Sequence, residues 1–407
     1  MNTQRVDMPP AQTATRHVVH VIAGLQTGGA EHMLLKLAGA ELPGLRQTVV
    51  SMTDEGPMGP QFRAAGIRLL TIGMPRGRLP VSGLLRLHRV LREERPDVVQ
   101  TWMYHADLVG GLLARLAGVR RVIWNIRHST LSPRDNKRTV RAVAWACARV
   151  SRWVPEQIIS CSRAGALTHQ AAGYADDRFV IIPNGVDGAR FRPDPTARAE
   201  LRATLGLAGD TPLLGCIARW DPQKNHAGLL EAWAGVVRDV PDAVLLLAGQ
   251  GVDQSNAVLH ALLQRSGVEG SVRVLGLRSD MPQLMAALDG LVLPSVHGEG
   301  FPNVLVEALA CGVPCVATDV GDAALILGAH GTVVPPADAS ALREALLALL
   351  GRGVRQGEQG AADRRRSDML ARFSLSQVLA RYANVYHSGV LPGALAEATA
   401  VDRTGPR

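Results

Sequence analysis

The sequence predicts two successive α/β domains, each a doubly wound parallel sheet with helices on both faces. Three observations predict this class: short β-branched runs alternate with helical patterns, most of these runs are apolar throughout, and the rhythm breaks once near the middle. Continuously apolar strands indicate burial on both faces, which is typical of parallel sheets. The chain has 407 residues, enough for two such domains at roughly 150 residues each.

Each half of the chain has its own series of expected strands, with helical patterns in most of the gaps. The first series comprises residues 17–25, 47–52, 67–73, 97–101, 121–126, 157–162 and 178–183. The second series comprises residues 211–219, 243–249, 271–276, 288–295 and 313–318. We expect the loops after the strand ends of both units to face a central cleft.

The boundary between the domains is predicted at PNGVDGARFRPDP (183–195), which contains three prolines and two glycines. FSLSQVLARYANVYHSG predicts a last amphipathic helix, and the arginines of 364–366 are expected to be exposed. The expected parts are a disordered tail (1–15), an N-terminal domain (16–190), a second domain (191–372), the last helix (373–389) and a second disordered tail (390–407).

The chain is basic, and the excess lies in its first half. It contains 44 Lys and Arg against 36 Asp and Glu, a formal net charge of +8. Residues 1–195 contain 26 basic and 15 acidic side chains, whereas residues 196–407 contain 18 and 21. Such an excess favours an anionic partner, which is a nucleic acid, a phosphorylated small molecule or an acidic membrane surface.

The cysteine and hydropathy patterns favour a cytoplasmic protein. The five cysteines form no CxxC pair and no metal-ligand spacing with histidine, so buried reduced thiols are expected. No apolar run reaches the roughly 18 residues of a membrane span. The first 15 residues lack the apolar core of a signal peptide.

The strongest chemical motif is HGEGFPNVLVEALACGVP (297–314), which places Glu299 in a Gly-rich loop and Glu307 in the helix that follows. Pro302 suits a helix start, because the first helical turn needs no N–H donor there. That turn is expected to offer free N–H groups to an anion from Asn303, Val304 and Leu305. Two carboxylates at different depths suit different hydroxyls of one nucleotide-sugar.

Two further motifs point to phosphate. In ARWDPQKNH, Arg219 ends a strand and Lys224 opens a helix, so both cations are expected at the carboxyl edge of the second sheet, where they would neutralise a departing diphosphate. In LQTGGAEHM, Gly28 and Gly29 would let backbone N–H groups approach a phosphate without obstruction by a Cβ atom. The pattern is not GxGxxG and no Walker lysine follows, which disfavours dinucleotide and P-loop sites.

These features in this order resemble the retaining glycosyltransferases of family 4, also called group 1, which have the GT-B fold. The resemblance covers about residues 17–388 and is carried by TGGAE, IPNGVD, IARWDPQKNH, LAGQG, LGLRSDMPQLMAALDGLVLPS and EGFPNVLVEALACGVPCVATDVG. It implies sugar transfer from a UDP- or GDP-sugar to a glycan or polyprenyl-linked acceptor with retained anomeric configuration, in cell-surface polysaccharide biosynthesis. It also implies that the last helix crosses back onto the N-terminal domain.

The resemblance assigns roles to the motif residues. Glu307 would bind the ribose, Glu299 the hydroxyls of the donor sugar, and Arg219 with Lys224 the diphosphate. The remaining donor-binding residues would be Gly28, Gly29, Arg278 near the nucleobase, Gly300, Phe301 and the amides of Asn303, Val304 and Leu305. No DxD spacing is present, so we expect no metal and no other cofactor.

The family often has a histidine at the end of a DVVHAH-type strand, and this chain departs from that pattern. DVVQTW places Trp102 at that position, with His105 following in WMYHADL. His128, at the end of the next strand in NIRHST, is the other candidate. Which of the two histidines faces the reacting sugar stays open.

The segment 120–152 contains nine basic residues against one acid. At helical spacing, one face carries Arg138, Arg141, Trp145, Arg149 and Arg152, while Val140, Val143, Cys147 and Val150 supply the opposing apolar stripe. Arginines beside a tryptophan suit an anionic headgroup layer or a polyprenyl diphosphate. This indicates peripheral contact with the inner face of the cell membrane; a solvated arginine face is the alternative.

Two other classes of function compete with the transferase. A sugar-nucleotide epimerase or a phosphorylase would share the fold, and would differ in releasing no nucleoside diphosphate on addition of an acceptor. A nucleic-acid-binding protein would explain the charge, but aromatic residues are only 4% of the chain and no helix-turn-helix, RNP or zinc spacing is present.

Overall fold

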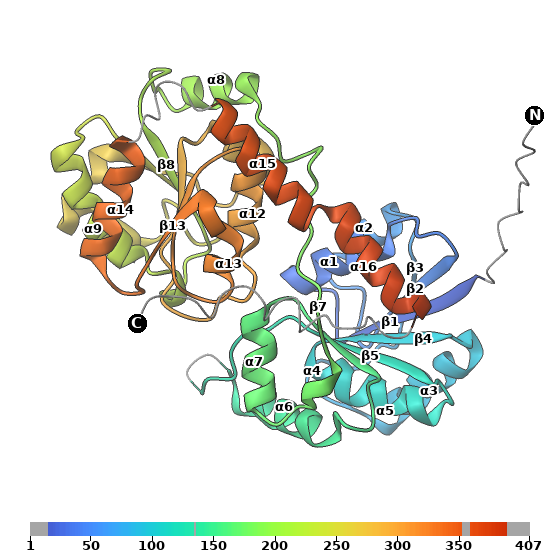
Figure 1. Ribbon diagram of the computed structural model, residues 1–407. Helices are drawn as coiled ribbons and strands as arrows, with labels where there is room; N and C mark the ends of the chain where they lie inside the picture. Colours follow the sequence, from blue (N-terminus) through green and yellow to red (C-terminus); the bar gives the residue numbers. More distant parts are fainter. Residues whose placement is uncertain (1–14, 134–135, 352–358, 389–407) are drawn as a thin grey trace, which may run out of the picture.

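The computed structural model describes residues 15–133, 136–351 and 359–388, and it contains two α/β domains (Figure 1). The predicted tails therefore lie outside the described residues except at position 15. The first sheet has the order β3-β2-β1-β4-β5-β6-β7, with every pairing parallel. Its strands are β1 (Arg16–Ile22), β2 (Leu45–Ser51), β3 (Arg68–Thr71), β4 (Val98–Trp102), β5 (Arg121–Ile126), β6 (Gln157–Ser160) and β7 (Phe179–Ile181).

Helices cover both faces of the first sheet because alternate strand residues point to opposite sides. Val19 and Val21 of β1 face one core, while Val18 and Ile22 face the other. The N-terminal helices are α1 (Gly29–Ala38), α2 (Gly59–Ala64), α3 (Val81–Glu94), α4 (Met103–His105), the π-helical turn η1 (Ala106–Gly110), α5 (Gly111–Leu116), α6 (Arg138–Val150), α7 (Arg163–Ala171) and the short turn η2 (Asp176–Arg178).

The second sheet has the order β10-β9-β8-β11-β12-β13 and is also parallel throughout. Its strands are β8 (Leu213–Ile217), β9 (Val244–Ala248), β10 (Val272–Val274), β11 (Gly290–Leu293), β12 (Cys315–Thr318) and β13 (Gly331–Val334). Its helices are α8 (Pro195–Thr204), α9 (His226–Asp239), α10 (Ala257–Ser266), α11 (Met281–Ala287), α12 (Asn303–Ala310), α13 (Ala323–Leu327), α14 (Ala339–Gly351) and α15 (Gln359–Phe373), with short turns η3 (Pro222–Lys224), η4 (Glu269–Ser271) and η5 (Gly328–His330).

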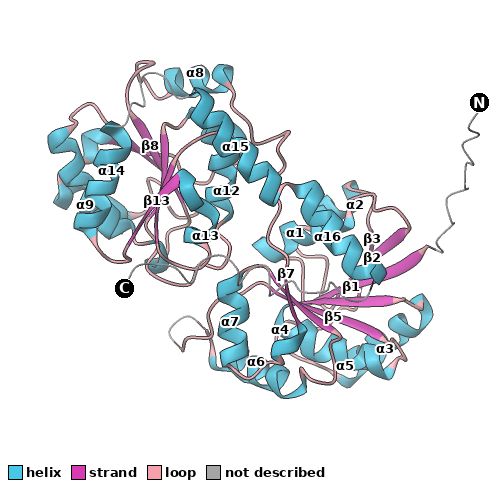
Figure 2. Cartoon of the chain, viewed as in Figure 1, coloured by secondary structure: helices cyan, strands magenta, loops and turns pink. Residues whose placement is uncertain are grey.

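The last helix, α16 (Leu375–Ser388), returns to the first domain, as Figures 1 and 2 show. Its buried residues Val378, Tyr382, Val385 and Tyr386 join the core formed by α1, α2 and one face of the first sheet. The chain thus crosses between the domains twice, and the two crossing segments are hydrogen-bonded to each other. The Val186 N–H donates to the Phe373 carbonyl at 2.9 Å, and the Leu375 N–H donates to the Val186 carbonyl at 2.8 Å.

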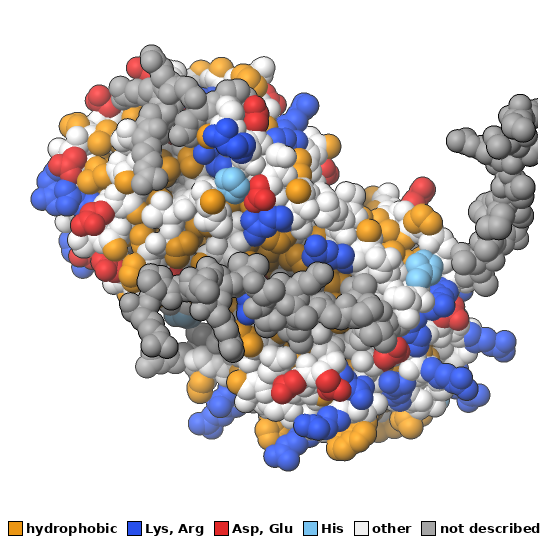
Figure 3. Space-filling view, in the orientation of Figure 1, with side chains coloured by type: hydrophobic (Ala, Val, Ile, Leu, Met, Phe, Trp, Pro, Cys, Tyr) orange, Lys and Arg blue, Asp and Glu red, His pale blue; other side chains and the backbone are white. Residues whose placement is uncertain are grey.

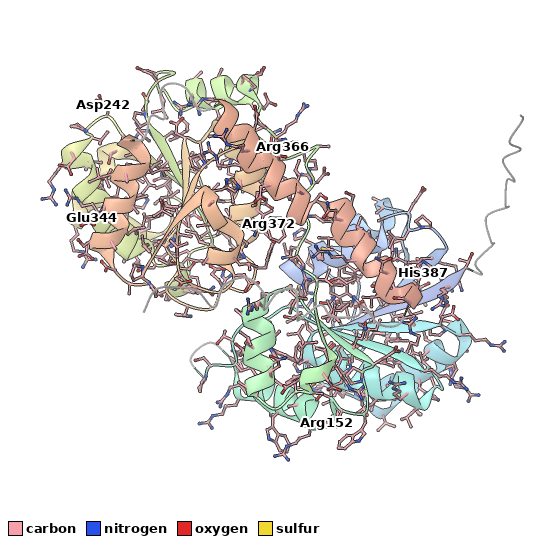
Figure 4. The ribbon with its side chains drawn as sticks, viewed as in Figure 1. Arg152, Asp242, Glu344, Arg366, Arg372 and His387 are labelled. Atoms are coloured by element: carbon pink, nitrogen blue, oxygen red, sulfur yellow. The ribbon has the colours of Figure 1, made fainter. Side chains whose placement is uncertain are left out.

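The predicted fold class and the return of the last helix are confirmed, but two expectations were wrong. The edge strand β13 was missing from the predicted series, because among its four residues only Val334 is buried and no apolar run marks it. The arginines of 364–366 are not all exposed. Arg366 points inward from α15 (Figure 4), and it donates to the carbonyls of Phe191, Ala310 and Gly188 at 2.5–2.7 Å.

All five cysteines are free and buried, as expected. Among the described residues, no helix is both long enough and apolar enough to cross a lipid bilayer.

Candidate active site

The candidate residues lie in loops and helix starts that follow the carboxyl ends of the strands in both sheets. These loops also make the contacts between the domains. Ser129, which follows β5, donates from Oγ to the Gly298 carbonyl at 3.0 Å. Asn184, which follows β7, donates from Nδ2 to Oδ1 of Asn303 at 2.6 Å. The carboxyl edges of the two sheets therefore meet, as expected for a doubly wound α/β pair.

Glu299 and Lys224 form the most buried charged contact of this region. Lys224 Nζ donates to Oε1 of Glu299, and the two side chains are only 12% and 9% exposed. Ser295 Oγ donates to the same oxygen at 2.5 Å. The loop after β11 and the turn η3 after β8 thus hold one carboxylate and one cation together, although 75 residues separate them in the chain.

Arg219 and Arg278 are partly exposed, and each is held by a nearby aspartate. Arg219 donates from Nε to Oδ2 of Asp221 at 3.1 Å and from Nη2 to Gln223 at 3.2 Å. Arg278 binds Asp280 through two hydrogen bonds of 2.8 and 2.5 Å. The carboxylate of Asp280 raises the pKa of Arg278, since it stabilises the charged form. Both guanidinium groups keep exposed surface on which an anion could bind.

The start of α12 matches the predicted helix position, with Pro302 as its N-cap. Phe301 is buried and packs edge-to-face against Phe373, with ring centroids 5.2 Å apart. One expected free amide is not free, because the Leu305 N–H donates to the Pro302 carbonyl at 3.2 Å in a tight first turn. The expectation of three free amides was therefore wrong for Leu305.

Glu307 lies deeper in α12 and faces cations that the sequence reasoning missed. Burial raises the pKa of Glu307, while the positive charges of Lys36 and Arg190 act in the opposite direction. Lys36 comes from α1 in the other domain and donates to the Gly185 carbonyl at 3.4 Å. Burial lowers the pKa of Lys36, which Glu307 partly offsets. Lys36 is one of three lysines in a chain rich in arginine, and this rarity was the available signal.

The Gly28-Gly29 segment begins α1 as predicted, with Gly28 as the N-cap. A Cβ atom at Gly28 would lie 2.6 Å from the Glu31 carboxylate, so Gly28 makes room for that side chain. A Cβ atom at Gly29 would meet no atom within 4 Å, so no packing contact within the protein requires glycine there. Burial raises the pKa of Glu31.

The two candidate histidines follow neighbouring strands. His105 is half-buried at the end of α4, and burial lowers its pKa. It lies between Met103, whose φ of 70° is strained for a non-glycine residue, and the π-helical turn η1 that begins at Ala106. His128 follows β5 and is exposed, and its ring lies 5.9 Å from that of Tyr104. Both histidines thus remain candidates.

Trp102 does not take the position that the resemblance suggested. Its side chain is fully buried in the core beneath α16, and its Nε1 donates to Nδ1 of His20 at 3.3 Å. Along β4, Val98, Gln100 and Trp102 share a parity, and Tyr386 of α16 donates to Gln100 at 2.7 Å. The indole therefore lies on the α16 side of the sheet.

In the part of the chain that the structure describes, no group of three or more His, Cys, Asp or Glu side chains is placed to hold a metal ion.

Comparison with known proteins gives the family. Residues 14–190 match the model described as Glycosyltransferase Family 4, and residues 211–352 match that described as Glycosyl transferases group 1. A GDP-mannose-dependent alpha-(1-6)-phosphatidylinositol monomannoside mannosyltransferase of Mycolicibacterium smegmatis is 31% identical over 69% of this chain and 74% of its own. An Escherichia coli UDP-Gal:alpha-D-GlcNAc-diphosphoundecaprenol alpha-1,3-galactosyltransferase is 26% identical over 59% of this chain and 62% of its own.

Solved structures show the same two-domain fold. The Anabaena protein HepE, solved in complex with UDP, superposes with a TM-score of 0.79 at 24% identity, covering 91% of this chain and 99% of that protein. WaaG, a glycosyltransferase involved in lipopolysaccharide biosynthesis, superposes with a TM-score of 0.66 at 19% identity, covering 91% and 100%. The fold is thus GT-B, and the chain belongs to glycosyltransferase family 4, the group 1 glycosyl transferases.

Proposed function

We propose that the protein transfers a sugar from a nucleotide-diphosphate sugar to a glycan or lipid-linked acceptor in cell-surface polysaccharide biosynthesis. The observation that carries this proposal is the buried Lys224–Glu299 contact at the carboxyl edge of the second sheet, beside the N-terminus of α12. A carboxylate accepts hydrogen bonds from sugar hydroxyls, while a cation and helix N–H groups bind phosphate. The names of the relatives support this activity class, since they specify UDP-Gal and GDP-mannose as donors.

In this proposal each site residue has one task. Glu299 orients the donor sugar, and Lys224 with Arg219 and the amides of Asn303 and Val304 neutralises the departing diphosphate. Glu307 binds the ribose. The bond from the anomeric carbon to the diphosphate breaks as the bond to the acceptor oxygen forms. A departing phosphate oxygen takes the acceptor proton on the same face, which retains the configuration and requires no metal.

Donor binding is tested by thermal unfolding with UDP-, GDP- and ADP-sugars, with and without EDTA. A donor at a hundredfold excess over its Kd stabilises the fold by about 2.7 kcal/mol, so the matching donor should raise Tm by several degrees whether or not EDTA is present. Glu307→Ala should abolish the shift because the ribose loses its acceptor. Glu231→Ala, on the second domain's helix α9, is the matched control and should keep it.

A second assay, which measures the release of nucleoside diphosphate, separates the competing activities. Release of nucleoside diphosphate that depends on an added glycan or lipid acceptor supports a transferase over an epimerase or phosphorylase. Three results would contradict the proposal: no shift with any donor, a full shift in Glu307→Ala, or a shift that EDTA removes and Mg²⁺ or Mn²⁺ restores.

We further propose that the N-terminal domain docks on an anionic membrane, where a polyprenyl-linked acceptor would be presented. The predicted arginine face of α6 is exposed, and the Arg149 guanidinium lies 5.0 Å from the Trp145 ring centroid. Arg152 projects from the outer end of this domain in Figure 4. Large apolar side chains are exposed on the same helical layer; they are Val81, Leu85, Leu112, Leu116, Trp145 and Trp153.

This layer is continuous. Arg115 of α5 donates to the Val154 carbonyl at 2.7 Å, which places α5 against the end of α6. In Figure 3, blue and orange side chains lie side by side over this lower part of the molecule. Not all basic residues of 120–152 serve the surface, however. Arg121 donates to the carbonyls of Val385 and Tyr386 at 2.7 and 2.8 Å and so caps α16.

Flotation with vesicles of anionic and of zwitterionic lipid tests this docking. At about 1 kcal/mol per arginine near the surface, reversing four charges should lower binding to anionic vesicles by well over tenfold. The variant carries glutamate at Arg138, Arg141, Arg149 and Arg152. The matched control carries glutamate at four exposed arginines of the second domain, namely Arg192, Arg238, Arg265 and Arg364. Equal flotation of wild type and the first variant would contradict the proposal.

A further inference from the structure

An interdomain contact outside the residues assigned above is made by Asp322, which precedes α13 in the second domain. Its carboxylate reaches the first turn of α7 in the other domain. Oδ2 accepts from the Arg163 N–H at 2.8 Å, and Oδ1 accepts from the Ala164 N–H at 2.9 Å. Asp322 is only 4% exposed. Burial raises the pKa of its carboxyl group, and the two N–H groups together with the charge of Arg163 act in the opposite direction.

This contact completes the N-terminus of α7. The first turn of a helix has N–H groups without partners inside the helix. The helix's own cap, Ser162, takes only the Gly165 N–H, at 3.0 Å. Asp322 takes the two N–H groups before it, so a carboxylate of one domain serves as a second cap for a helix of the other. Charged acceptors at a helix N-terminus are favoured by the helix dipole as well as by the hydrogen bonds.

The same residue also supports the loop that carries Glu299. The Asp322 backbone N–H donates to the Gly300 carbonyl at 2.9 Å. The preceding Gly321 has φ of 65°, and a Cβ atom there would lie 2.7 Å from that same carbonyl oxygen. On the other side, a Cβ atom at Gly300 would lie 3.3 Å from Ser162 Oγ. The loop at 298–300 is therefore enclosed between Asp322 and the N-terminal domain.

The Asp322 contact can break when the domains separate and form again when they close. It consists of one carboxylate and two backbone N–H groups, all of which water can solvate when the domains separate, unlike the apolar core beneath α16. Separation would also release the Ser129 contact to Gly298, which lies one residue before Glu299. Closure of the domains and placement of the Glu299 carboxylate are thus coupled through the same short loop.

We propose that Asp322 is an interdomain latch and a positioning residue: by capping α7 it holds the domains closed and sets the Glu299 loop against the acceptor-side domain. Its catalytic consequence rests on the transferase function proposed above, whereas its effect on domain closure does not. The residues to which the proposed function assigns donor contacts, from Arg219 to Glu307, all lie in the second domain. Loss of the latch should therefore lower turnover more than donor affinity.

The experiment breaks the latch from each side. Asp322→Asn keeps the shape of the side chain but places an amide NH₂, which cannot accept a hydrogen bond, against one of the two N–H donors. Asp322→Ala removes both acceptor oxygens. From the α7 side, Arg163→Pro removes one N–H. Arg163 is the first helical residue, where proline is tolerated, and Ser162 before it is extended (φ −148°, ψ 152°), as a residue before proline prefers. Arg163→Ala is the matched control, because it keeps the N–H.

Asp322→Ala and Arg163→Pro should increase the radius of gyration measured by small-angle X-ray scattering, while Arg163→Ala and the exposed neighbour variant Asp319→Ala should not. With an active donor and acceptor, misplacement of the loop should lower kcat by about tenfold to a hundredfold. The donor-induced Tm shift should stay at the wild-type value. The double variant Asp322→Asn, Arg163→Pro should lose less kcat than the two single losses combined, because both substitutions act on the same contact.

Two results would overturn the latch: an unchanged radius of gyration in both Asp322→Ala and Arg163→Pro, or the same loss of kcat in Arg163→Ala as in Arg163→Pro. If instead the wild type transfers no sugar, the proposed function fails while the scattering comparison still decides the latch. A variant that does not fold shows no cooperative thermal transition, and Asp322→Asn then supplies the comparison.

Discussion

Glu299→Gln should lower kcat by at least about a hundredfold, in the range found when one preorganised polar group is removed from an active site. The carboxylate is held by Lys224 and Ser295 in a nearly dry environment, where losing its charge has a large effect. Glutamine keeps the size and can still accept from Ser295. It cannot balance the Lys224 charge or hold a sugar hydroxyl as strongly.

The measurement is acceptor-dependent release of nucleoside diphosphate with the donor that gives the largest thermal shift. Ser295→Ala is the comparison, because it removes one hydrogen bond to the same oxygen and keeps the charge, and its loss should be much smaller. A Glu299→Gln enzyme with kcat within threefold of wild type would remove Glu299 from the proposed mechanism.

Asp289→Ala should produce the largest loss of stability, about 3–5 kcal/mol, the range for removing one partner of a buried ion pair. Asp289 lies just before β11 and joins three groups. It binds Arg198 and Arg202 of α8 at 2.5 and 2.6 Å and accepts from the Leu213 N–H at 2.8 Å. Arg202 is the critical partner, because its side chain is 2% exposed and would keep an uncompensated charge.

Urea unfolding followed by tryptophan fluorescence measures this effect as a shift of the transition midpoint. Arg198→Ala is the matched control: its side chain is 32% exposed, so its loss should cost only about 1 kcal/mol or less. If Asp289→Ala lowered the midpoint no more than Arg198→Ala does, Asp289 would not anchor α8 to the second sheet.

The fold was predictable because strands buried on both faces leave continuous apolar runs, and helices between them leave a different period. The grouping of Glu299 with Lys224 was predictable for a related reason: each follows the end of a parallel strand, and such ends share one edge. The position of Trp102 was not predictable in the same way: strand parity groups it with Val98 and Gln100, but only the structure shows that α16 covers that face.

Other parts of the site had little or no local signal. Asn184 and Asp322 acquire their partners only when the two domains meet, and no spacing along the chain marks them. For Lys36, the rarity of lysine in this chain was the one available signal. The predicted exposure of Arg366 was wrong for a different reason. A run of three arginines suggests a solvated surface, yet the carbonyl groups of Gly188, Phe191 and Ala310 need a donor, and the long Arg366 side chain reaches them.

The return of α16 has a consequence for how the protein is made. The N-terminal domain is synthesised first, and domains commonly begin to fold in that order. The part of one sheet face that α1 and α2 leave uncovered nevertheless stays open until residues 375–388 leave the ribosome, because Tyr382 and Tyr386 complete that core. The domain that begins first is therefore finished last, after the whole second domain has been made. A nascent chain released early would expose the apolar surface around Trp102, which makes this face the point at which quality control by chaperones and proteases would recognise an incomplete protein.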